Sequence, residues 1–251
     1  MELSVIIPYY HEPYLEKTIN SLKENSVGEI EILPIEGSKG MRAAINEGIS
    51  RSTGKFIMKV DAHCIFGRGF DKILTEDCKE NWLMIPRRYS INHDWTRSDA
   101  KPYIDYHFLS YPDLFVINWV NRKTDMEIDG TMTFQGSCYL ANREYFMNRV
   151  GYLDDNPQTY GTFAADNLEV GLKYWLGGDE VKVNKRTWYG HLFKNKQSYI
   201  DGIFNRDYKK GSQFKRNWAW VTDHWMNDKE PGMVRKLSWL VEKFKPVPTW
   251  P

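Results

Sequence analysis

An aspartate and a histidine spaced two residues apart, Asp61 and His63, are the side chains best suited to chemistry. They lie where the apolar segment 56–61, which predicts a buried strand, comes to its end. In open α/β sheets, ligands bind beyond the carboxyl ends of strands. Because alternate residues of an extended chain point the same way, a carboxylate oxygen and an imidazole nitrogen could here bind one divalent cation, together with diphosphate oxygens and water. A surface turn would accommodate the same tripeptide, so the spacing alone is a weak signal.

A further histidine, His191, lies in the aromatic segment 188–193. Such a histidine can pack in an aromatic cluster, and for a lone histidine that is the simpler interpretation. A zinc site formed by His63, Cys64 and His191 is another interpretation. We rank it low, because the thiol directly follows His63 and no second cysteine is spaced to complete the site.

The elements that would position these residues begin with a β-α-β-α-β pattern. Apolar runs predict strands, and apolar residues at helical spacing predict the helices between them. The expected strands are 3–8, 30–35 and 56–61, and the expected helices are 13–25 and 41–51. This order predicts a parallel sheet and an α/β nucleotide-binding half over residues 1–64.

The chain from residue 65 to residue 195 mixes strands, helices and long loops. The expected helices are 69–80, 142–147 with Asn142 as its cap, and 164–176, and the expected strands are 82–86, 131–140 and 180–183. Residues 87–112 are polar and aromatic, and we expect a loop over a site there. Residues 154–162 also predict a loop.

The composition of the 251 residues excludes several classes of protein. A formal charge of +1 argues against a uniformly basic nucleic-acid coat, and 41% hydrophobic residues argue against a disordered chain. The longest nearly apolar stretch, 114–120, is far shorter than the roughly 20 residues of a membrane-spanning helix. Without a leader-like start or CxxC spacing, we expect a protein of the reducing cytoplasm. Ten tryptophans among 15% aromatic residues are compatible with stacking on sugars or bases.

Residues 196–251 differ from the preceding chain in charge and aromatic content. They carry eleven Lys or Arg, six Asp or Glu, and five of the ten tryptophans. We expect two or three helices, the last near 233–244, and a proline-rich end. Side chains that could together bind nucleic acid are Lys209, Lys210, Lys215, Arg216, Trp218 and Trp220. A solvated helix face with tryptophans in the core explains the same residues, and the sequence leaves both interpretations open.

Three early segments resemble the nucleotide-sugar half of a GT-A glycosyltransferase of the large family 2 type. They are SVIIPYYHE at 4–12, GMRAAINEG at 40–48 and TGKFIMKVDAH at 53–63. Four blocks then follow, in order, the pattern of the polypeptide N-acetylgalactosaminyltransferases: DAHC at 61–64, GSCYLANREYF at 136–146, ADNLE at 165–169 and YGHLFK at 189–194. Four blocks in order are much more specific than any one, and the resemblance covers about residues 1–195.

The resemblance implies a GT-A fold, a mixed α/β sheet flanked by helices, over residues 1–195. It supplies no counterpart for 196–251, which the residues themselves predict to be a mainly helical extension. It implies that Asp61, His63 and His191 hold Mn2+, or Mg2+, against the diphosphate of the donor. Residues implied to border the nucleotide sugar are Pro8, Tyr9, Glu12, Glu36, Arg42, Asp61, Ala62, Gly136 and Ser137. The implied catalytic pair is Asp166 and Asn167, in which the aspartate either deprotonates the acceptor or binds a sugar hydroxyl.

The activity implied by the resemblance is metal-dependent transfer of a sugar from a nucleoside-diphosphate donor, with UDP favoured, to a hydroxyl group. The acceptor could be a glycan, a protein or a hydroxymethylated base in DNA. The alternative is a non-catalytic module that binds a nucleotide sugar or a glycan, and the presence of Asp166 beside the metal ligands favours the enzyme. Where relatives carry a mobile Trp-Gly-Gly loop, this chain has Tyr-Gly-Thr-Phe at 160–163, which leaves lid motion open.

Overall fold

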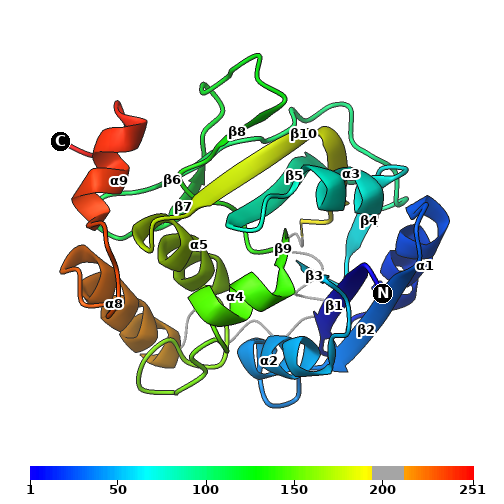
Figure 1. Cartoon of the computed structure of the whole chain (residues 1–251), viewed down its shortest axis with the longest axis horizontal. Coiled ribbons are helices and arrows are strands. Elements are labelled where there is room, and N and C mark those ends of the chain that lie inside the picture. The colour runs from blue at the N-terminus through cyan, green and yellow to red at the C-terminus, as the bar shows by residue number, and fades with distance from the viewer. Residues whose placement is uncertain (194–211) are drawn as a thin grey trace.

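The computed structural model describes residues 1–193 and 212–251. The described part is built on a central sheet flanked by helices (Figure 1). In spatial order its strands are β2 (Ile30–Glu36), β1 (Leu3–Tyr9), β3 (Phe56–Val60), β9 (Cys138–Asn142), β5 (Trp82–Ser90), β10 (Glu180–His191) and β4 (Cys64–Phe66), with β8 (Ile128–Gly130) beside β10. A separate pair is formed by β6 (His107–Leu109) and β7 (Val116–Asn118).

The first half has the predicted β-α-β-α-β order. β1 pairs in parallel with both β2 and β3, and the connections are α1 (Leu15–Asn25) and α2 (Met41–Arg51). β9 pairs antiparallel with β3, so the sheet is mixed, as predicted for the whole fold. Because parallel strands present their carboxyl ends at one edge, the residues that follow β1, β2 and β3 meet there.

Two strands are longer than predicted. β5 continues to Ser90 and β10 to His191, because the two pair in parallel and end with these residues opposite each other. The register shifts at a bulge between Asn184 and Trp188. This bulge interrupts the apolar alternation of β10, and the sequence pattern therefore predicts only its first residues.

The segment 87–112, predicted as a loop, contains the end of β5 and all of β6. β6 pairs antiparallel with β7, with His107 opposite Asn118. Strands of three residues are too short to produce a periodic signal, and their partner strand lies outside the predicted segment. The strand predicted over 131–140 is likewise shifted, to Cys138–Asn142.

Helix starts follow local signals in two cases and depart from them in a third. α3 (Phe70–Asp77) lies within its predicted span. α4 (Arg143–Arg149) begins after Asn142, whose side chain accepts the Tyr145 N–H at 3.0 Å, and this confirms the predicted cap. α5 (Asp166–Leu176) begins two residues later than predicted, because Ala164 and Ala165 both have positive φ.

The C-terminal helices, α8 (Ser212–Met226) and α9 (Leu237–Phe244), lie on the side of the molecule opposite the N-terminus (Figure 1). Trp225 is fully buried and, with Leu240, belongs to the same apolar cluster as Trp175 of α5. Part of the tryptophan content of this region therefore serves the core. Of the basic residues predicted for nucleic-acid binding, Lys209 and Lys210 lie outside the described residues, and that binding stays a prediction.

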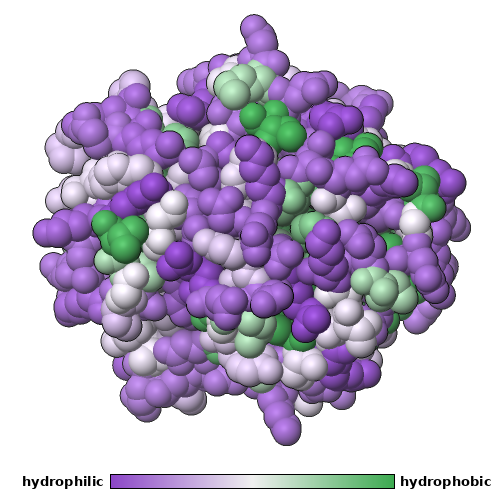
Figure 2. All heavy atoms as spheres, viewed as in Figure 1, coloured by the Kyte–Doolittle hydropathy of each residue, from purple (hydrophilic) through white to green (hydrophobic). Residues whose placement is uncertain are grey.

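The core consists of two main apolar clusters. Ile6 belongs to one and its neighbours Val5 and Ile7 to the other, because alternate residues of β1 face opposite sides of the sheet. The face drawn in Figure 2 is mostly hydrophilic, with hydrophobic side chains scattered over it. None of the described helices is long and apolar enough to cross a membrane.

Candidate active site

Two strand ends bring the predicted metal ligands together. β3 ends at Val60, and Asp61 and His63 lie in the short connection to β4. β10 ends at His191, which pairs antiparallel with Cys64 at the start of β4. One ligand atom from each of Asp61, His63 and His191 lies within 4.8 Å of the others, and both histidines are buried. We call these three residues the Asp61 group.

The donor atoms of the Asp61 group face one another. Asp61 Oδ2 lies 3.3 Å from His191 Nε2 and 3.9 Å from His63 Nε2. On the other side of its ring, His63 Nδ1 lies 3.1 Å from Glu12 Oε2, a contact that orients Nε2 toward the group. One carboxylate oxygen and two imidazole nitrogens form a donor set that fits Mn2+ and other first-row divalent cations.

Burial and neighbouring charges set the protonation states of this group. Burial lowers the pKa of His191 to about 4, so its imidazole is neutral at neutral pH. Burial would raise the pKa of Asp61, but Lys59 and the two histidines more than offset it, and this pKa lies well below its ordinary value. A neutral imidazole and an ionised carboxylate are the forms that bind a metal ion.

Lys59 is a residue of the site that the sequence analysis missed. Its side chain is 3% exposed, and its Nζ lies 2.5 Å from Asp61 Oδ1, 2.5 Å from the carbonyl oxygen of Gly136 and 3.8 Å from Asp166 Oδ2. Burial opposes the charge of Lys59, but the two aspartates more than compensate and raise its pKa. The ammonium group thus links the Asp61 group to the candidate catalytic carboxylate. The sequence feature that could have identified this residue is a lysine inside the otherwise apolar run 56–60.

The predicted catalytic pair begins α5. Asp166 is 4% exposed, and its Oδ2 has no hydrogen-bond partner among the described residues. Burial raises the pKa of Asp166 despite the nearby charges of Lys59 and Arg42. Asn167 Nδ2 donates to the carbonyl oxygen of Phe134 at 2.7 Å and so ties the start of the helix to the segment that leads into β9.

The two small residues predicted to border the sugar lie between Asp166 and the Asp61 group. A Cβ atom at Gly136 would lie 2.7 Å from Asp166 Oδ1, so only glycine leaves room for this carboxylate. Ser137 is buried, and its carbonyl oxygen accepts the Asp61 N–H at 2.9 Å. The Ser137 hydroxyl pairs with the hydroxyl of Tyr189 at 2.7 Å. Gly136 and Ser137 therefore help to fix both ends of the site.

The residues predicted on the nucleobase side lie at the ends of β1 and β2. Pro8 is buried, and the half-buried Tyr9 pairs with Glu36, which is exposed. Ala62 is buried within the turn of the Asp61 group. These residues share the sheet edge with the Asp61 group, and their contact with a donor stays a prediction.

Arg42, another predicted donor residue, is fully buried, and its guanidinium group has several protein partners. It forms an ion pair with Glu169 of α5 and donates to the carbonyl oxygens of Asp154 and Ala164 at 2.7 and 2.8 Å. Its Cζ also lies 4.5 Å from the ring centroid of Tyr160. Arg42 thus ties the loop before α5 to α2, and a contact with the donor stays a prediction.

The same loop is held from its other side by α8. Tyr160 is 3% exposed, and its hydroxyl accepts the Trp225 Nε1–H at 2.8 Å. Asn217 of α8 donates to the carbonyl oxygens of Pro157 and Thr159 at 2.8 and 2.6 Å. Tyr160, the first residue of the Tyr-Gly-Thr-Phe segment, is therefore anchored on a C-terminal helix.

Cys64 does not join the Asp61 group. It is completely buried, and burial raises the pKa of its thiol well above the ordinary value, which keeps it protonated. The candidate metal group found in the described part of the chain contains an aspartate and two histidines, without a cysteine. The structure therefore gives no support to the zinc interpretation.

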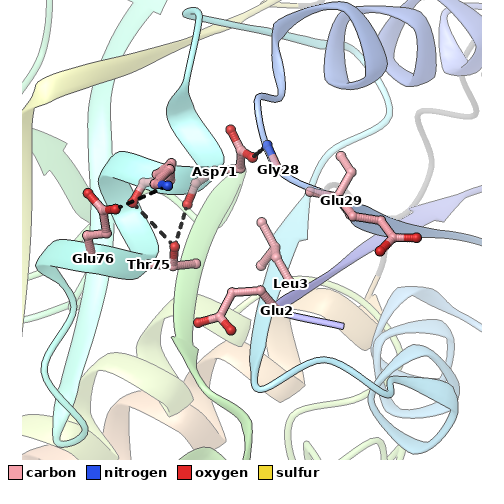
Figure 3. A pocket seen from close by; sticks show the side chains of 9 residues that line it. Glu2, Leu3, Gly28, Glu29, Asp71, Thr75 and Glu76 are labelled. Atoms are coloured by element: carbon pink, nitrogen blue, oxygen red, sulfur yellow. Dashed lines mark hydrogen bonds and ion pairs between the residues drawn. The ribbon is translucent and has the colours of Figure 1, made fainter.

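A hollow separate from the candidate active site lies where β1 and β2 begin, at the opposite ends of these strands (Figure 3). Side chains drawn along it include Glu2, Leu3, Glu29, Asp71, Thr75 and Glu76. Asp71 accepts the Gly28 N–H at 2.7 Å, so its carboxylate stabilises the loop between α1 and β2. Because the hollow borders the first residues of β1 and β2, the length of these strands separates it from the Asp61 group.

Comparison with known proteins finds similarity to glycosyltransferases, although no protein-family model matches. Human polypeptide N-acetylgalactosaminyltransferase 3 is 23% identical over 208 residues, which cover 76% of this chain and 30% of that protein. The human probable polypeptide N-acetylgalactosaminyltransferase 8 is 23% identical over 250 residues, which cover 91% of this chain and 34% of that protein. The chain thus spans about a third of the length of these curated relatives.

Two solved structures share the arrangement of the chain. A structure of GalNAc-T7 with UDP, GalNAc and Mn2+ superposes with a TM-score of 0.68 at 16% identity, covering 90% of this chain and 49% of that one. A structure of S. aureus TarS 1-349 in complex with UDP-GlcNAc superposes with a TM-score of 0.54 at 13% identity, covering 78% of this chain and 59% of that one.

Proposed function

We propose that this chain, which has the GT-A fold and is related to the polypeptide N-acetylgalactosaminyltransferases and TarS, transfers a sugar from a UDP-linked donor to a hydroxyl acceptor. One observation carries the proposal. The Asp61 group and the buried carboxylate of Asp166 contact the same ammonium group, that of Lys59. A module that only binds a nucleotide sugar has no need of this second carboxylate.

The first half of the proposed site serves the leaving group. The Asp61 group would hold a divalent cation, which when bound would neutralise negative charge on the leaving diphosphate. Nζ of Lys59 contacts Oδ1 of Asp61, and Glu12 contacts Nδ1 of His63. Both metal-binding side chains are therefore oriented before a cation or a donor binds. Lys59 also places a positive charge beside the site of transfer.

The second half of the proposed site is Asp166. Its carboxylate borders Gly136, and its raised pKa suits a group that accepts a proton from an acceptor hydroxyl. An oxygen without a hydrogen-bond partner can also accept a hydrogen bond from a sugar hydroxyl, the role expected in a retaining enzyme. The anomeric configuration of the product, read by NMR, separates the two roles.

The comparisons indicate which donors to test first, and the sequence analysis gives the acceptor classes. The relatives are named as N-acetylgalactosaminyltransferases, and one structural neighbour holds UDP-GlcNAc, so UDP-N-acetylhexosamines are the first donors to test. The acceptor classes considered from the sequence remain a glycan, a protein and hydroxymethylated DNA. A cytoplasmic location belongs to the same proposal.

Release of UDP tests the proposal. The protein is incubated with Mn2+ and a panel of nucleotide sugars, with and without EDTA and each acceptor class. We expect release that requires the metal and increases with one acceptor. Asp61→Asn and His191→Ala are expected to abolish it, whereas His93→Ala, which changes an exposed histidine, serves as the matched control. Tight UDP binding without release from any donor would instead support the non-catalytic module.

A further inference from the structure

Two consecutive arginines on β5 have contrasting surroundings. Arg87 forms a two-point ion pair with Asp105, in which Nε and Nη2 donate at 2.7 and 2.8 Å. Arg88 is 4% exposed, and its guanidinium donates only to two neutral amide oxygens, Gln135 Oε1 and Asn118 Oδ1, the latter at 2.7 Å. Within residues 1–193 and 212–251, no carboxylate lies at ion-pair distance from Arg88.

A buried guanidinium without an anion is an unfavourable arrangement. Transfer of a charge out of water is costly unless a counter-ion or strong hydrogen bonds compensate it, and burial accordingly lowers the pKa of Arg88. The neighbouring His107 offers no compensation, because burial and the charge of Arg88 hold its pKa well below the ordinary value.

The position of Arg88 relates it to the candidate active site. Gln135 directly precedes Gly136, which borders Asp166. The ring of Phe193 lies 5.0 Å from Arg88 Cζ and 4.8 Å from the ring of His191. Phe193 therefore contacts both the Asp61 group and the arginine.

Two of the side chains that contact Arg88 lie at the surface. Phe193 is 40% exposed, and Asn118, at the end of β7, is also exposed. Both can turn without disturbing the core, and rotation of the Asn118 and Gln135 amides would present their NH2 groups in place of their oxygens. An anion could thus reach the guanidinium and find further hydrogen-bond donors beside it.

We propose that Arg88, with Asn118 and Gln135, binds a phosphate or carboxylate group of the acceptor substrate. The planar guanidinium matches the paired oxygens of such groups, and the two amide oxygens occupy N–H positions that the anion would take. The assignment to the acceptor rests on the proposed function, in which the donor diphosphate lies at the Asp61 group. The binding of an anion at Arg88 does not rest on it.

Inorganic phosphate is the probe. Thermal unfolding of the full chain is followed in EDTA with increasing sodium phosphate, against sodium chloride at equal ionic strength, since an anion that binds the folded state raises the unfolding midpoint. We expect the wild type and Arg87→Gln to respond. In Arg88→Gln, the apparent affinity for phosphate is expected to fall by about tenfold or more.

Asn118→Asp keeps the arginine and places a carboxylate at the position of one of its amide partners. We expect this variant to have a higher unfolding midpoint without phosphate and to lose the response to phosphate. No response in the wild type, or a response retained in both Arg88→Gln and Asn118→Asp, would overturn the anion site.

Binding of UDP in the presence of Mn2+ distinguishes the two sources of phosphate. Equal affinity in the wild type and Arg88→Gln supports the acceptor assignment, whereas a tenfold loss would place the donor diphosphate at Arg88 and overturn it. The phosphate titration uses neither donor nor metal. Its failure is therefore distinguishable from a failure of metal-dependent UDP release.

Discussion

Nζ of Lys59 lies 2.5 Å from Oδ1 of Asp61, and this ion pair leaves the two oxygens of the carboxylate with different partners. One oxygen is bound by the lysine, and the other faces His191 at 3.3 Å. Because the lysine side chain is only 3% exposed, water cannot replace it. The aspartate is therefore available to a metal ion through one oxygen, in an orientation fixed by its own strand.

Replacement of Lys59 by methionine should destabilise the protein and increase its dependence on metal. The change leaves Asp61 and Asp166 without their shared counter-charge, and removal of one partner of a buried pair costs about 3–5 kcal/mol. Mn2+ would supply positive charge at the same place. Urea unfolding with and without Mn2+ should therefore show a larger metal stabilisation in Lys59→Met than in the wild type.

The matched control is Lys55→Met. Lys55 is on the surface, 3.9 Å from Glu2, and both side chains are more than half exposed. Its replacement should change the free energy of unfolding by less than about 1 kcal/mol, with or without Mn2+. Equal metal stabilisation in Lys59→Met and the wild type would contradict the charge-sharing role of Lys59.

Asp166→Asn should separate transfer from donor binding. The amide keeps the shape of the side chain but cannot accept the proton of an acceptor hydroxyl, and loss of general-base catalysis slows transfer by about 10²–10⁴-fold. UDP affinity should stay within about twofold of the wild type, because the metal ligands are retained. Asp155→Asn, at an exposed position of the preceding loop, is the control. Parallel loss of binding and transfer would show that Asp166 acts on the donor.

Gly136→Ala should impair transfer through Asp166. The added Cβ would lie 2.7 Å from Asp166 Oδ1, and either the carboxylate or the segment before β9 must move. Gly130→Ala is a suitable control, since its Cβ would meet no atom closer than 3.6 Å. Single-turnover rates with saturating donor measure the difference. A fully active Gly136→Ala would mean that the carboxylate tolerates displacement.

The stability of the metal-free protein should fall in acid in a way that depends on His191. Burial places its folded pKa at about 4, below the value near 6.5 expected for an unfolded histidine. Above about pH 6.5 this histidine is neutral in both states and leaves the free energy of unfolding unchanged. As the pH falls toward 4, the unfolded state takes up a proton that the folded state does not, and the free energy of unfolding falls by about 3 kcal/mol at most. In EDTA, the difference in free energy of unfolding between the wild type and His191→Gln should shrink over this interval. A difference that is constant or grows on acidification would refute the assignment.

The sequence predicted those parts of the fold that depend on local pattern. The β-α-β-α-β order and the cap at Asn142 follow from apolar spacing and side-chain chemistry within a few residues. The two-residue spacing of Asp61 and His63 predicted that their side chains lie together, and the structure places them in one group. His191 was associated with them only through the order of the sequence blocks, since the pairing of β10 with β4 brings it from 128 residues away.

The remainder depends on contacts that no local pattern encodes. Lys59 lies in an apolar run, and its contact with Asp166 depends on where the fold places the start of α5. Arg87 and Arg88 are neighbours in sequence, yet one meets Asp105 and the other meets amides from two distant segments. One of those amides, that of Asn118, lies on β7, a strand that the sequence pattern did not predict.

The burial of Trp225 against the elements that carry the active site has a consequence for how the molecule unfolds. Side chains of α8 and α9 complete a cluster that also contains Trp175, which belongs to the helix that begins with Asp166. Neither part can open its side of this cluster without exposing the other. The C-terminal helices and the sheet are therefore expected to melt in one cooperative transition.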